Sequence, residues 1–344
     1  MGLGKTLQAL TIIAQYRQEW PAIVIAPATL RLVWREQATK WLPTLLPQPS
    51  DVQVIMHGKQ RVDPAAQVII VSYDLLAKHT ELQVRSDGEP FNVVVVDESQ
   101  YIKSAQAERT QAVLKICRES QHCILISGTP MQNRVEELYT QLQAVFPGLE
   151  QEFSYAKYCA RYCAGTNRHS ELNAFLSTIM SRHLKADVLH QLPSKFRQKV
   201  TLEPVKADVE KMKAVRQQVR LEFGASLEDW LSSNQGLHRP GALPAIMRTF
   251  KATAEAKLQC VSQYVEHLLG GVAKLLLFAH HHAMLDNLER TLKKQSVRYV
   301  RIDGTTPQGR RAGLVEVFQT KSDVRVALLS ITACGQGLTL TAAH

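Results

Sequence analysis

The sequence predicts an α/β protein with two parallel-sheet lobes. Short β-rich runs alternate with helical stretches in the first and last parts of the chain. Runs such as VVVV and VIIV are apolar throughout, which is typical of parallel strands covered by helices on both faces. Between these parts the helical pattern dominates. We therefore predict a first lobe over 1–150, a mainly helical insertion and linker over 151–250, and a second lobe over 251–344.

The first lobe is predicted to hold five strands, three of which end in polar residues. They are AIVIAPA at 22–28, VQVIMHG at 52–58, QVIIVSY at 67–73, FNVVVVDES at 91–99 and HCILISGTP at 122–130. In a doubly wound sheet, ligands bind beyond the carboxyl ends of the strands. Three of these ends read SYD, DES and GTP, so we expect a site there.

The later part of the chain repeats this organisation after a helical stretch. The middle region mixes aromatic and basic residues in helical patterns, with one β-like segment, QKVTLEP at 198–204. Strands are then predicted in AKLLLFAHHH at 273–282, VRYVRIDG at 297–304 and VRVALLS at 324–330. Helices between them again favour a parallel sheet.

The charge balance favours a polyanionic partner. Lys and Arg number 41 against 31 Asp and Glu, a formal net charge of +10, which suits nucleic acid. Five basic residues and only Asp187 as an acid lie within 182–199; on charge alone this is either a solvated surface or a DNA-backbone contact. No stretch approaches the roughly 20 apolar residues needed to cross a bilayer, so no membrane partner is expected.

The opening MGLGKT predicts a phosphate-binding loop. Gly2 and Gly4 allow backbone N–H groups to approach phosphate oxygens, Lys5 can meet the β and γ phosphates, and the Thr6 hydroxyl can bind Mg²⁺. Such a loop normally follows a strand, and none precedes it here. A surface loop with this composition by chance is therefore the alternative.

Two further polar motifs follow buried strands. VVVVDESQ delivers Asp97 and Glu98 to a strand end, where the aspartate can hold Mg²⁺ and the glutamate can orient or deprotonate a water. Capping of the next helix is the alternative role for these acids. In ILISGTP, the hydroxyls of Ser127 and Thr129 can hydrogen-bond to the acidic pair, although Gly and Pro alone would predict an ordinary turn.

The order of these motifs resembles the Swi/Snf-type ATPases of helicase superfamily two, over nearly the whole chain. The matching motifs are GLGKT, PATL at 27–30, SYDLL at 72–76, DESQ at 97–100, SGTPMQN at 127–133, EELY at 136–139, RIDGTT at 301–306 and SITACGQGLTLTAA at 330–343. The segments HLKADVLHQLPSK, TAEAKL, LLFAHHHAMLDNLE and RIDGTT are most similar to the annealing helicases of the HARP type.

This resemblance implies two RecA-like lobes that close over ATP, with a helical insertion between them. It implies ATP-driven tracking along double-stranded or forked DNA, hence replication-fork remodelling and DNA repair in a nucleus. A single-stranded-DNA-binding protein is an expected partner of flanking regions. A nucleosome-remodelling ATPase and a catalytically silent DNA-binding fragment are the alternatives.

The resemblance also assigns residues by position. The catalytic set is Lys5, Asp97, Glu98 and Gln100. The ATP-binding set is Gly2, Gly4, Lys5, Thr6, Gly335 and Gly337, and Thr6 and Asp97 would bind Mg²⁺. The DNA-binding set is Thr29, Ser72, Tyr73, Arg182, Lys185, Gly304, Thr305 and Thr306.

Several positions depart from the family pattern. Gln100 stands where the family usually has His; it can still bridge to SGTP by hydrogen bonds, but it cannot titrate. His183 replaces an arginine in the family's RRLK-like stretch. We do not expect zinc at His280–His282, because FAHH is a family-like pattern. We do not expect it at Cys159 and Cys163 either, because a single C-x3-C without a second Cys pair does not fit a structural site.

The resemblance implies family segments beyond both ends of these 344 residues. A strand and an adenine-binding segment would precede GLGKT, and a final motif would supply arginines that reach the γ-phosphate. We therefore expect Met1 to be an internal methionine of a longer protein. We also expect this chain to bind DNA but to hydrolyse ATP slowly, since such arginines raise phosphoryl-transfer rates by orders of magnitude.

Overall fold

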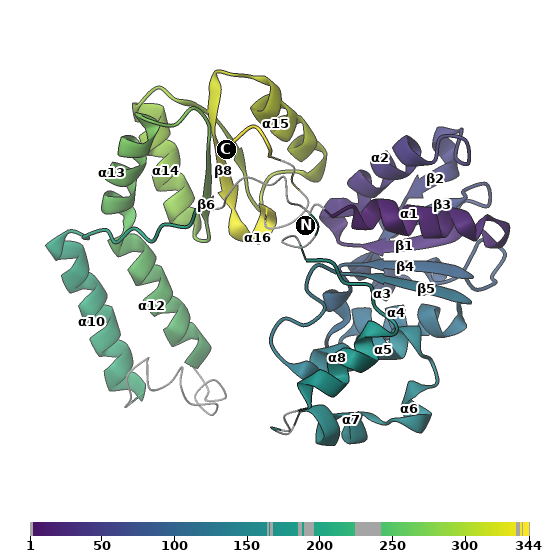
Figure 1. Cartoon of the computed structure of the whole chain (residues 1–344). Helices are drawn as coiled ribbons and strands as arrows, with labels where there is room; N and C mark the ends of the chain where they lie inside the picture. The colour runs from purple at the N-terminus through teal and green to yellow at the C-terminus, as the bar shows by residue number, and fades with distance from the viewer. Residues whose placement is uncertain are drawn as a thin grey trace. The chain divides into compact units, whose positions relative to one another are not determined.

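The computed structural model describes residues 3–163, 165, 168–184, 188, 196–223, 242–334, 338 and 340–343. Its internal contacts divide the chain into two compact units, Met1–Ser194 and Lys195–His344. Each unit contains one parallel β-sheet (Figure 1). The prediction of two parallel-sheet α/β lobes is confirmed.

The first unit is built on a five-stranded sheet in the order β2-β3-β1-β4-β5. The strands are β1 (Ala22–Ala26), β2 (Val52–Val54), β3 (Val68–Ser72), β4 (Val93–Asp97) and β5 (His122–Ile126). Each lies inside a predicted run, and all paired neighbours are parallel. Their carboxyl ends therefore share one edge of the sheet, which brings the polar motifs together.

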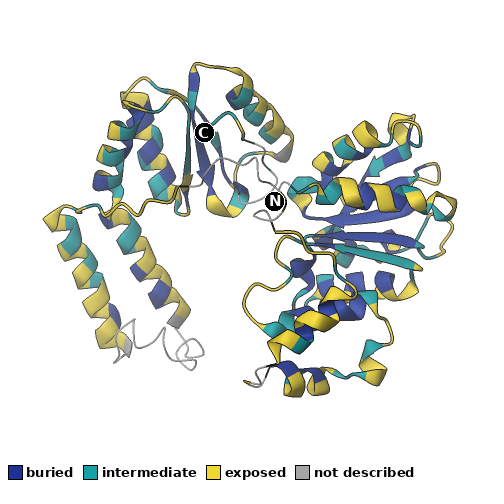
Figure 2. Cartoon of the chain, in the orientation of Figure 1, coloured by how far each residue is buried: buried dark blue, intermediate teal, exposed yellow. Residues whose placement is uncertain are grey.

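Helices cover both faces of this sheet (Figure 1). On one face lie α1 (Lys5–Gln15) and α2 (Arg31–Trp41); on the other lie α3 (Tyr73–Lys78), α4 (Glu108–Glu119) and α5 (Tyr139–Val145). Successive residues of β1 alternate between the two cores, since Ile23 packs with α3 and α4, and Val24 with α1 and α2. Strands β1, β3 and β4 are buried along their whole length, whereas the edge strand β5 is mostly half-buried (Figure 2). Burial on both faces explains the continuous apolar sequence of the three inner strands.

Three further helices extend the first unit. They are α6 (Leu149–Glu152), α7 (Tyr155–Tyr162) and α8 (His169–Ser177). Tyr158 of α7 and Leu172 of α8 join Leu142 of α5 in one apolar cluster. Short 3-10 helices occupy Arg17–Glu19, Ala28–Leu30, Pro49–Asp51, Thr80–Leu82, Ser99–Ile102 and Val135–Leu138.

The second unit has a three-stranded sheet in the order β6-β8-β7. Its strands are β6 (Leu275–Ala279), β7 (Arg298–Ile302) and β8 (Val324–Ser330). Its helices are α10 (Lys206–Phe223), α12 (Ala242–Ala256), α13 (Leu258–Leu269), α14 (His282–Lys294), α15 (Gln308–Thr320) and α16 (Ile331–Cys334). Leu328 of β8 packs with α13 and α14, whereas its neighbour Leu329 packs with Phe318 of α15.

The predicted middle region is divided between the two units. Helices α7 and α8 pack in the first, while α10 and α12 lie side by side in the second (Figure 1). The prediction of β-structure at 198–204 is wrong, because this mostly exposed segment belongs to neither sheet. Within the described residues, no helix has both the length and the apolar character of a membrane span.

Candidate active site

An acidic pair lies at the carboxyl end of β4. Asp97 is the last residue of that strand, and Glu98 follows it with φ 53° and ψ 53°. This left-handed conformation is uncommon for a residue with a Cβ and is found preferentially at functional sites. The Glu98 N–H donates a 2.9 Å hydrogen bond to Asp97 Oδ1. The backbone turn thus fixes one oxygen of the Asp97 carboxylate.

The other oxygen of Asp97 is held by a tryptophan that the sequence reasoning missed. Trp34 Nε1 donates a 2.8 Å hydrogen bond to Asp97 Oδ2, and both side chains are buried. Burial raises the pKa of Asp97, while the Trp34 hydrogen bond and the charge of Lys5 act in the opposite direction. Each carboxylate oxygen accepts about two hydrogen bonds, so the described contacts leave both oxygens able to bind a cation.

The phosphate-loop residues lie at the start of α1. Gly4 has φ 72° and ψ 20°, a conformation that favours glycine, and α1 begins at Lys5. No described side chain caps this helix end, and its first turn carries no acid. A helix N-terminus of this kind attracts anions through its N–H groups and dipole. Gly2 lies outside the described residues.

Lys5 reaches toward the SGTP motif, and Thr6 lies in the same helical turn. A Cβ built on Gly128 would lie 4.0 Å from Lys5 Nζ, so the ammonium group stands beside the turn that follows β5. The structure therefore places Lys5 beside the end of β5, and the charge of Lys5 acts to lower the pKa of Asp97. The side chain of Thr6 is half-buried. A lysine, a hydroxyl and a carboxylate suit a magnesium–nucleotide complex.

Gln100 connects the acidic pair to the SGTP motif, as its bridging role predicts. Gln100 Nε2 donates a 2.6 Å hydrogen bond to Glu98 Oε2, and Ser127 Oγ donates at 2.6 Å to Gln100 Oε1. Thr129 N–H in turn donates at 3.0 Å to Ser127 Oγ. The amide of Gln100 is buried and uses both of its ends, so the side chains of DESQ and SGTP form one continuous hydrogen-bonded chain.

A second connection involves Gln141 of α5, which the sequence reasoning also missed. Ser99 Oγ donates a 2.7 Å hydrogen bond to Gln141 Oε1, and Gln141 Nε2 donates at 2.6 Å to the Pro130 carbonyl. Gln141 lies just after EELY, a motif that the sequence analysis identified, but its spacing alone did not indicate this contact. The turns after β4 and β5 are therefore joined by two separate side-chain connections, one through Gln100 and one through Gln141.

The DNA residues predicted in the first unit differ in exposure. Thr29 is half-buried in the Ala28–Leu30 turn, and Arg182 is exposed. Ser72 and Tyr73 are each only 3% exposed, and the Tyr73 hydroxyl donates to the Asp97 carbonyl at 2.5 Å. Packing against the strand end thus buries both side chains, and the placement of this segment along the DNA backbone stays a prediction. Lys185 lies outside the described residues.

In the second unit, the RIDGTT loop is organised around Asp303. The Asp303 carboxylate accepts hydrogen bonds from the Thr305 N–H at 2.9 Å, the Thr305 hydroxyl at 2.7 Å and Arg301 Nε at 2.8 Å. Thr306 Oγ1 accepts from the Asp303 N–H at 3.0 Å. Gly304 and Thr305 are exposed at the tip. Asp303 thus shapes the loop that presents them; Gly335 and Gly337 lie outside the described residues.

Asp303 belongs to a charged cluster centred on Arg301. Arg301 Nη1 lies 2.8 Å from Asp286 Oδ1 and also bonds to Glu289. Burial acts to raise the pKa of Asp303, but hydrogen bonds from Thr305 and Arg301 lower it to about 2. Hydrogen bonds lower the pKa of Glu289 to about 2, and the largest effects come from Tyr299 and then from Lys293. These carboxylates are charged at neutral pH and fix Arg301.

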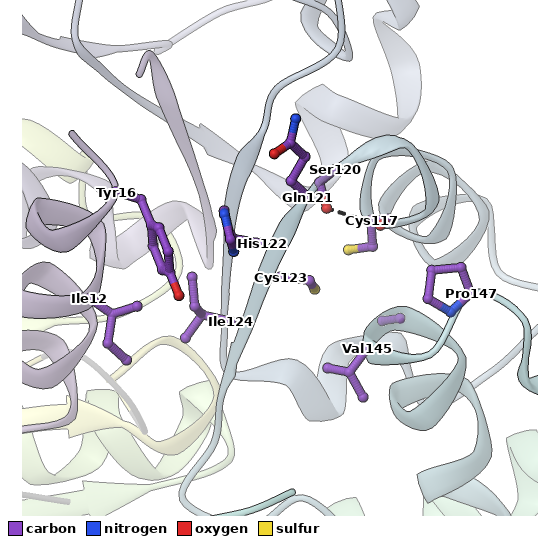
Figure 3. A pocket seen from close by; sticks show the side chains of 11 residues that line it. Ile12, Tyr16, Cys117, Ser120, Gln121, His122, Cys123, Ile124, Val145 and Pro147 are labelled. Carbon is purple, nitrogen blue, oxygen red and sulfur yellow. Dashed lines mark hydrogen bonds between the residues drawn. The ribbon is translucent and has the colours of Figure 1, made fainter. Parts of the chain in front are cut away.

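A cavity of about 310 Å³ opens at the other end of β5. Figure 3 shows Tyr16, His122 and Cys123 among its lining residues. His122 is the first residue of β5, so this cavity lies away from the strand ends that carry the polar motifs. It is distinct from the predicted nucleotide site. Across the described part of the chain, no three His, Cys, Asp or Glu side chains are grouped as metal ligands.

The two parallel sheets and the ordered strand-end motifs define a helicase-like α/β core. Residues 1–253 match the SNF2-related domain, and residues 256–344 match the helicase conserved C-terminal domain. The chain belongs to the SNF2-related family.

Among its relatives, the chain is 39% identical over 367 residues to "DNA annealing helicase and endonuclease ZRANB3" of Mus musculus, covering 100% of this chain and 33% of that protein. It is 36% identical over 356 residues to "SWI/SNF-related matrix-associated actin-dependent regulator of chromatin subfamily A-like protein 1" of Xenopus tropicalis, covering 100% and 36%. The chain thus spans about a third of the length of these curated relatives.

A solved structure, "Sulfolobus solfataricus SWI2/SNF2 ATPase core in complex with dsDNA", is also similar, at 21% identity and a TM-score of 0.49. The alignment covers 100% of this chain and 74% of that one.

Proposed function

We propose that this chain is the motor core of an ATP-dependent duplex-DNA translocase that acts as an annealing helicase. Its setting would be replication-fork remodelling and DNA repair in a nucleus, and a single-stranded-DNA-binding protein would be a partner of the longer protein. The named similarity to annealing helicases supports this choice over nucleosome remodelling. The observation that carries the ATPase function is the hydrogen-bonded chain from Glu98 through Gln100 to Ser127.

The residues at the strand ends would divide the work of ATP hydrolysis. Lys5, with the backbone of Gly2 and Gly4, would bind the phosphates, and Thr6 and Asp97 would hold Mg²⁺. Bound Mg²⁺ would neutralise phosphate charge. Glu98 would orient and deprotonate the attacking water. The carboxylate of Glu98 would itself be held in place by the amide of Gln100. Gly335 and Gly337 would complete the ATP site.

DNA would be held through its phosphates. Exposed Arg182, the exposed tip of the RIDGTT loop and the Thr29 turn offer basic, backbone and hydroxyl groups, and Lys185 would add a further charge. Such contacts carry no base information. A formal net charge of +10 supports a sequence-independent mode, and affinity should fall steeply with salt.

The test is ATP turnover by the purified chain with and without forked duplex DNA, beside Lys5→Ala. If DNA stimulates ATP turnover by the parent chain and the Lys5→Ala variant shows no such turnover, the result supports a working motor. No turnover by a folded chain would instead support the catalytically silent alternative. Stimulation by nucleosomes well above that by free DNA of equal length would favour chromatin remodelling.

A further inference from the structure

Two buried aromatic side chains connect the acidic pair to the segments predicted to face DNA. Trp34 lies on α2, the helix that begins at Arg31 directly after the PATL turn, and Tyr73 is the first residue of α3, directly after Ser72. Trp34 is 1% exposed and Tyr73 is 3% exposed. Each uses its single N–H or O–H donor on Asp97 or its neighbour.

We propose that Trp34 and Tyr73 are positioning residues, through which the two segments predicted to lie along DNA, around Thr29 and around Ser72, hold Asp97 and Glu98 in place for magnesium–ATP. This proposal rests on the proposed function and adds a route by which bound DNA regulates the nucleotide site. Trp34 acts on the carboxylate of Asp97, while Tyr73 acts on the backbone of the pair.

Trp34 controls the rotation of the Asp97 carboxylate. The terminal torsion of an aspartate is intrinsically soft, but here the two oxygens are held separately, by Trp34 Nε1 at 2.8 Å and the Glu98 N–H at 2.9 Å. Without the indole N–H, one oxygen would lose its described donor. The partners that orient a metal ligand in this way affect metal affinity strongly.

The PATL turn is joined by a hydrogen bond to Arg31, the first residue of the helix that carries Trp34. Arg31 Nε donates to the Ala28 carbonyl at 3.2 Å, and Arg31 Nη1 donates to the Ile55 carbonyl, which ties the turn to the end of β2. Ala38 of α2 is buried in the same core as Trp34. A shift of the turn on DNA binding would therefore move α2 as a unit and carry the indole with it.

Tyr73 controls the backbone on which both acids stand. Its hydroxyl donates to the Asp97 carbonyl at 2.5 Å and lies 3.4 Å from the Glu98 carbonyl. The peptide between these residues leads into the left-handed conformation of Glu98, which costs energy for a non-glycine residue. A hydroxyl on this carbonyl stabilises the turn, and its position depends on the segment around Ser72.

Two single substitutions remove these donors while keeping an aromatic ring: Trp34→Phe and Tyr73→Phe. The chain offers a matched control for each. Trp41, at the end of the same helix, also donates its indole N–H, but to Gln37 Oε1 at 2.9 Å and away from the site. Tyr158 is likewise buried and donates its hydroxyl to the Val135 carbonyl at 3.0 Å.

Three quantities are measured on the whole chain. They are the Mg²⁺ concentration that half-saturates binding of a fluorescent ADP, kcat and KM for ATP with saturating duplex DNA, and DNA affinity without nucleotide. Trp34→Phe should raise the half-saturating Mg²⁺ about 10- to 100-fold. Tyr73→Phe should lower kcat about fivefold, the loss of one neutral hydrogen bond, with KM nearly unchanged. Trp41→Phe and Tyr158→Phe should match the parent.

The outcomes separate this inference from the function on which it rests. A parent chain that neither binds ADP with Mg²⁺ nor hydrolyses ATP rejects the proposed function, and the inference with it. A parent that does both, with Trp34→Phe and Tyr73→Phe equal to their controls, overturns the inference alone. If Trp34→Phe does not fold, 3-benzothienylalanine at this position keeps the fused rings and lacks the N–H; unchanged Mg²⁺ dependence would then overturn the role of Trp34.

Discussion

Ser127 Oγ donates a 2.6 Å hydrogen bond to Gln100 Oε1, and this contact joins the turns that follow β5 and β4. Gln100 passes the connection on to Glu98. A change in the position of the SGTP turn, beside which Lys5 stands, therefore reaches the glutamate through two hydrogen bonds. Because a glutamine amide donates at one end and accepts at the other, it fits this bridging position without a change of protonation.

Gln100→Ala should lower ATP turnover about tenfold, because the carboxylate of Glu98 loses a donor and hydrogen bonds to charged groups are the stronger class. Gln100→His restores a side chain with a donor and an acceptor, and should recover most of the activity. Turnover measured from pH 5.5 to 8 should then gain a dependence near the ordinary histidine pKa, about 6.5, which the parent lacks at this position. Equal turnover in Gln100→Ala and the parent would contradict the bridge.

Glu98→Gln should permit ATP binding and block its hydrolysis, because an amide can hold a water but cannot take its proton. A fall in kcat of at least about a hundredfold is expected, with the affinity for a fluorescent nucleotide within a factor of about two. Glu108→Gln, at the start of α4, is a matched control. Unchanged turnover in Glu98→Gln would remove Glu98 from the catalytic set.

Arg182→Ala should weaken DNA binding equally on unrelated sequences. If the exposed guanidinium contacts one phosphate, the slope of log affinity against log salt should fall by about one. Binding is measured by fluorescence anisotropy at several salt concentrations. Arg118→Ala, exposed on α4, should leave the slope unchanged; a slope equal to the parent's in Arg182→Ala would exclude Arg182 from the DNA surface.

The second unit should lose stability in acid through Asp303 and Glu289. Their folded pKa values, each lowered to about 2, lie below the unfolded values of about 4, so the unfolded chain binds more protons between these limits. The stabilisation is complete above about pH 5 and is lost as the pH falls toward 2. Asp303 alone contributes about 2 kcal/mol.

The variant Arg301→Gln tests this cluster by calorimetry at pH 7 and pH 3. Three carboxylates share this cation, so its removal should lower the free energy of unfolding by about 3 kcal/mol at pH 7. The variant should then lose less stability than the parent when the pH is lowered from 7 to 3. Arg298→Gln breaks an exposed pair with Asp323 and should have little effect. If the thermal unfolding midpoint of Arg301→Gln equals that of the parent at pH 7, this cluster does not stabilise the second unit.

The site was predictable where it depends on local sequence. Asp97 follows four consecutive valines, and a run that is apolar on both faces must lie between two helical layers. The strand end, and with it the place of Asp97 and Glu98, follows from the chain alone. The bridging of Gln100 to the SGTP turn was predictable for the same reason, since neighbouring parallel strands end at one edge. The prediction of β-structure at 198–204 was wrong because a β-like sequence pattern does not by itself provide a neighbouring strand with which to pair.

The sequence by itself determined the two parallel sheets, the order of the motifs and the family of this protein. These features depend on short segments, because a few consecutive residues decide whether a strand is buried on both faces and where a turn forms. Only the tertiary structure decided that Trp34 bonds to Asp97, 63 positions away, and that Tyr73 is buried under the strand end. Such contacts depend on how helices pack across a sheet, and the periodicity of a helix specifies its buried face without specifying which atom that face will meet.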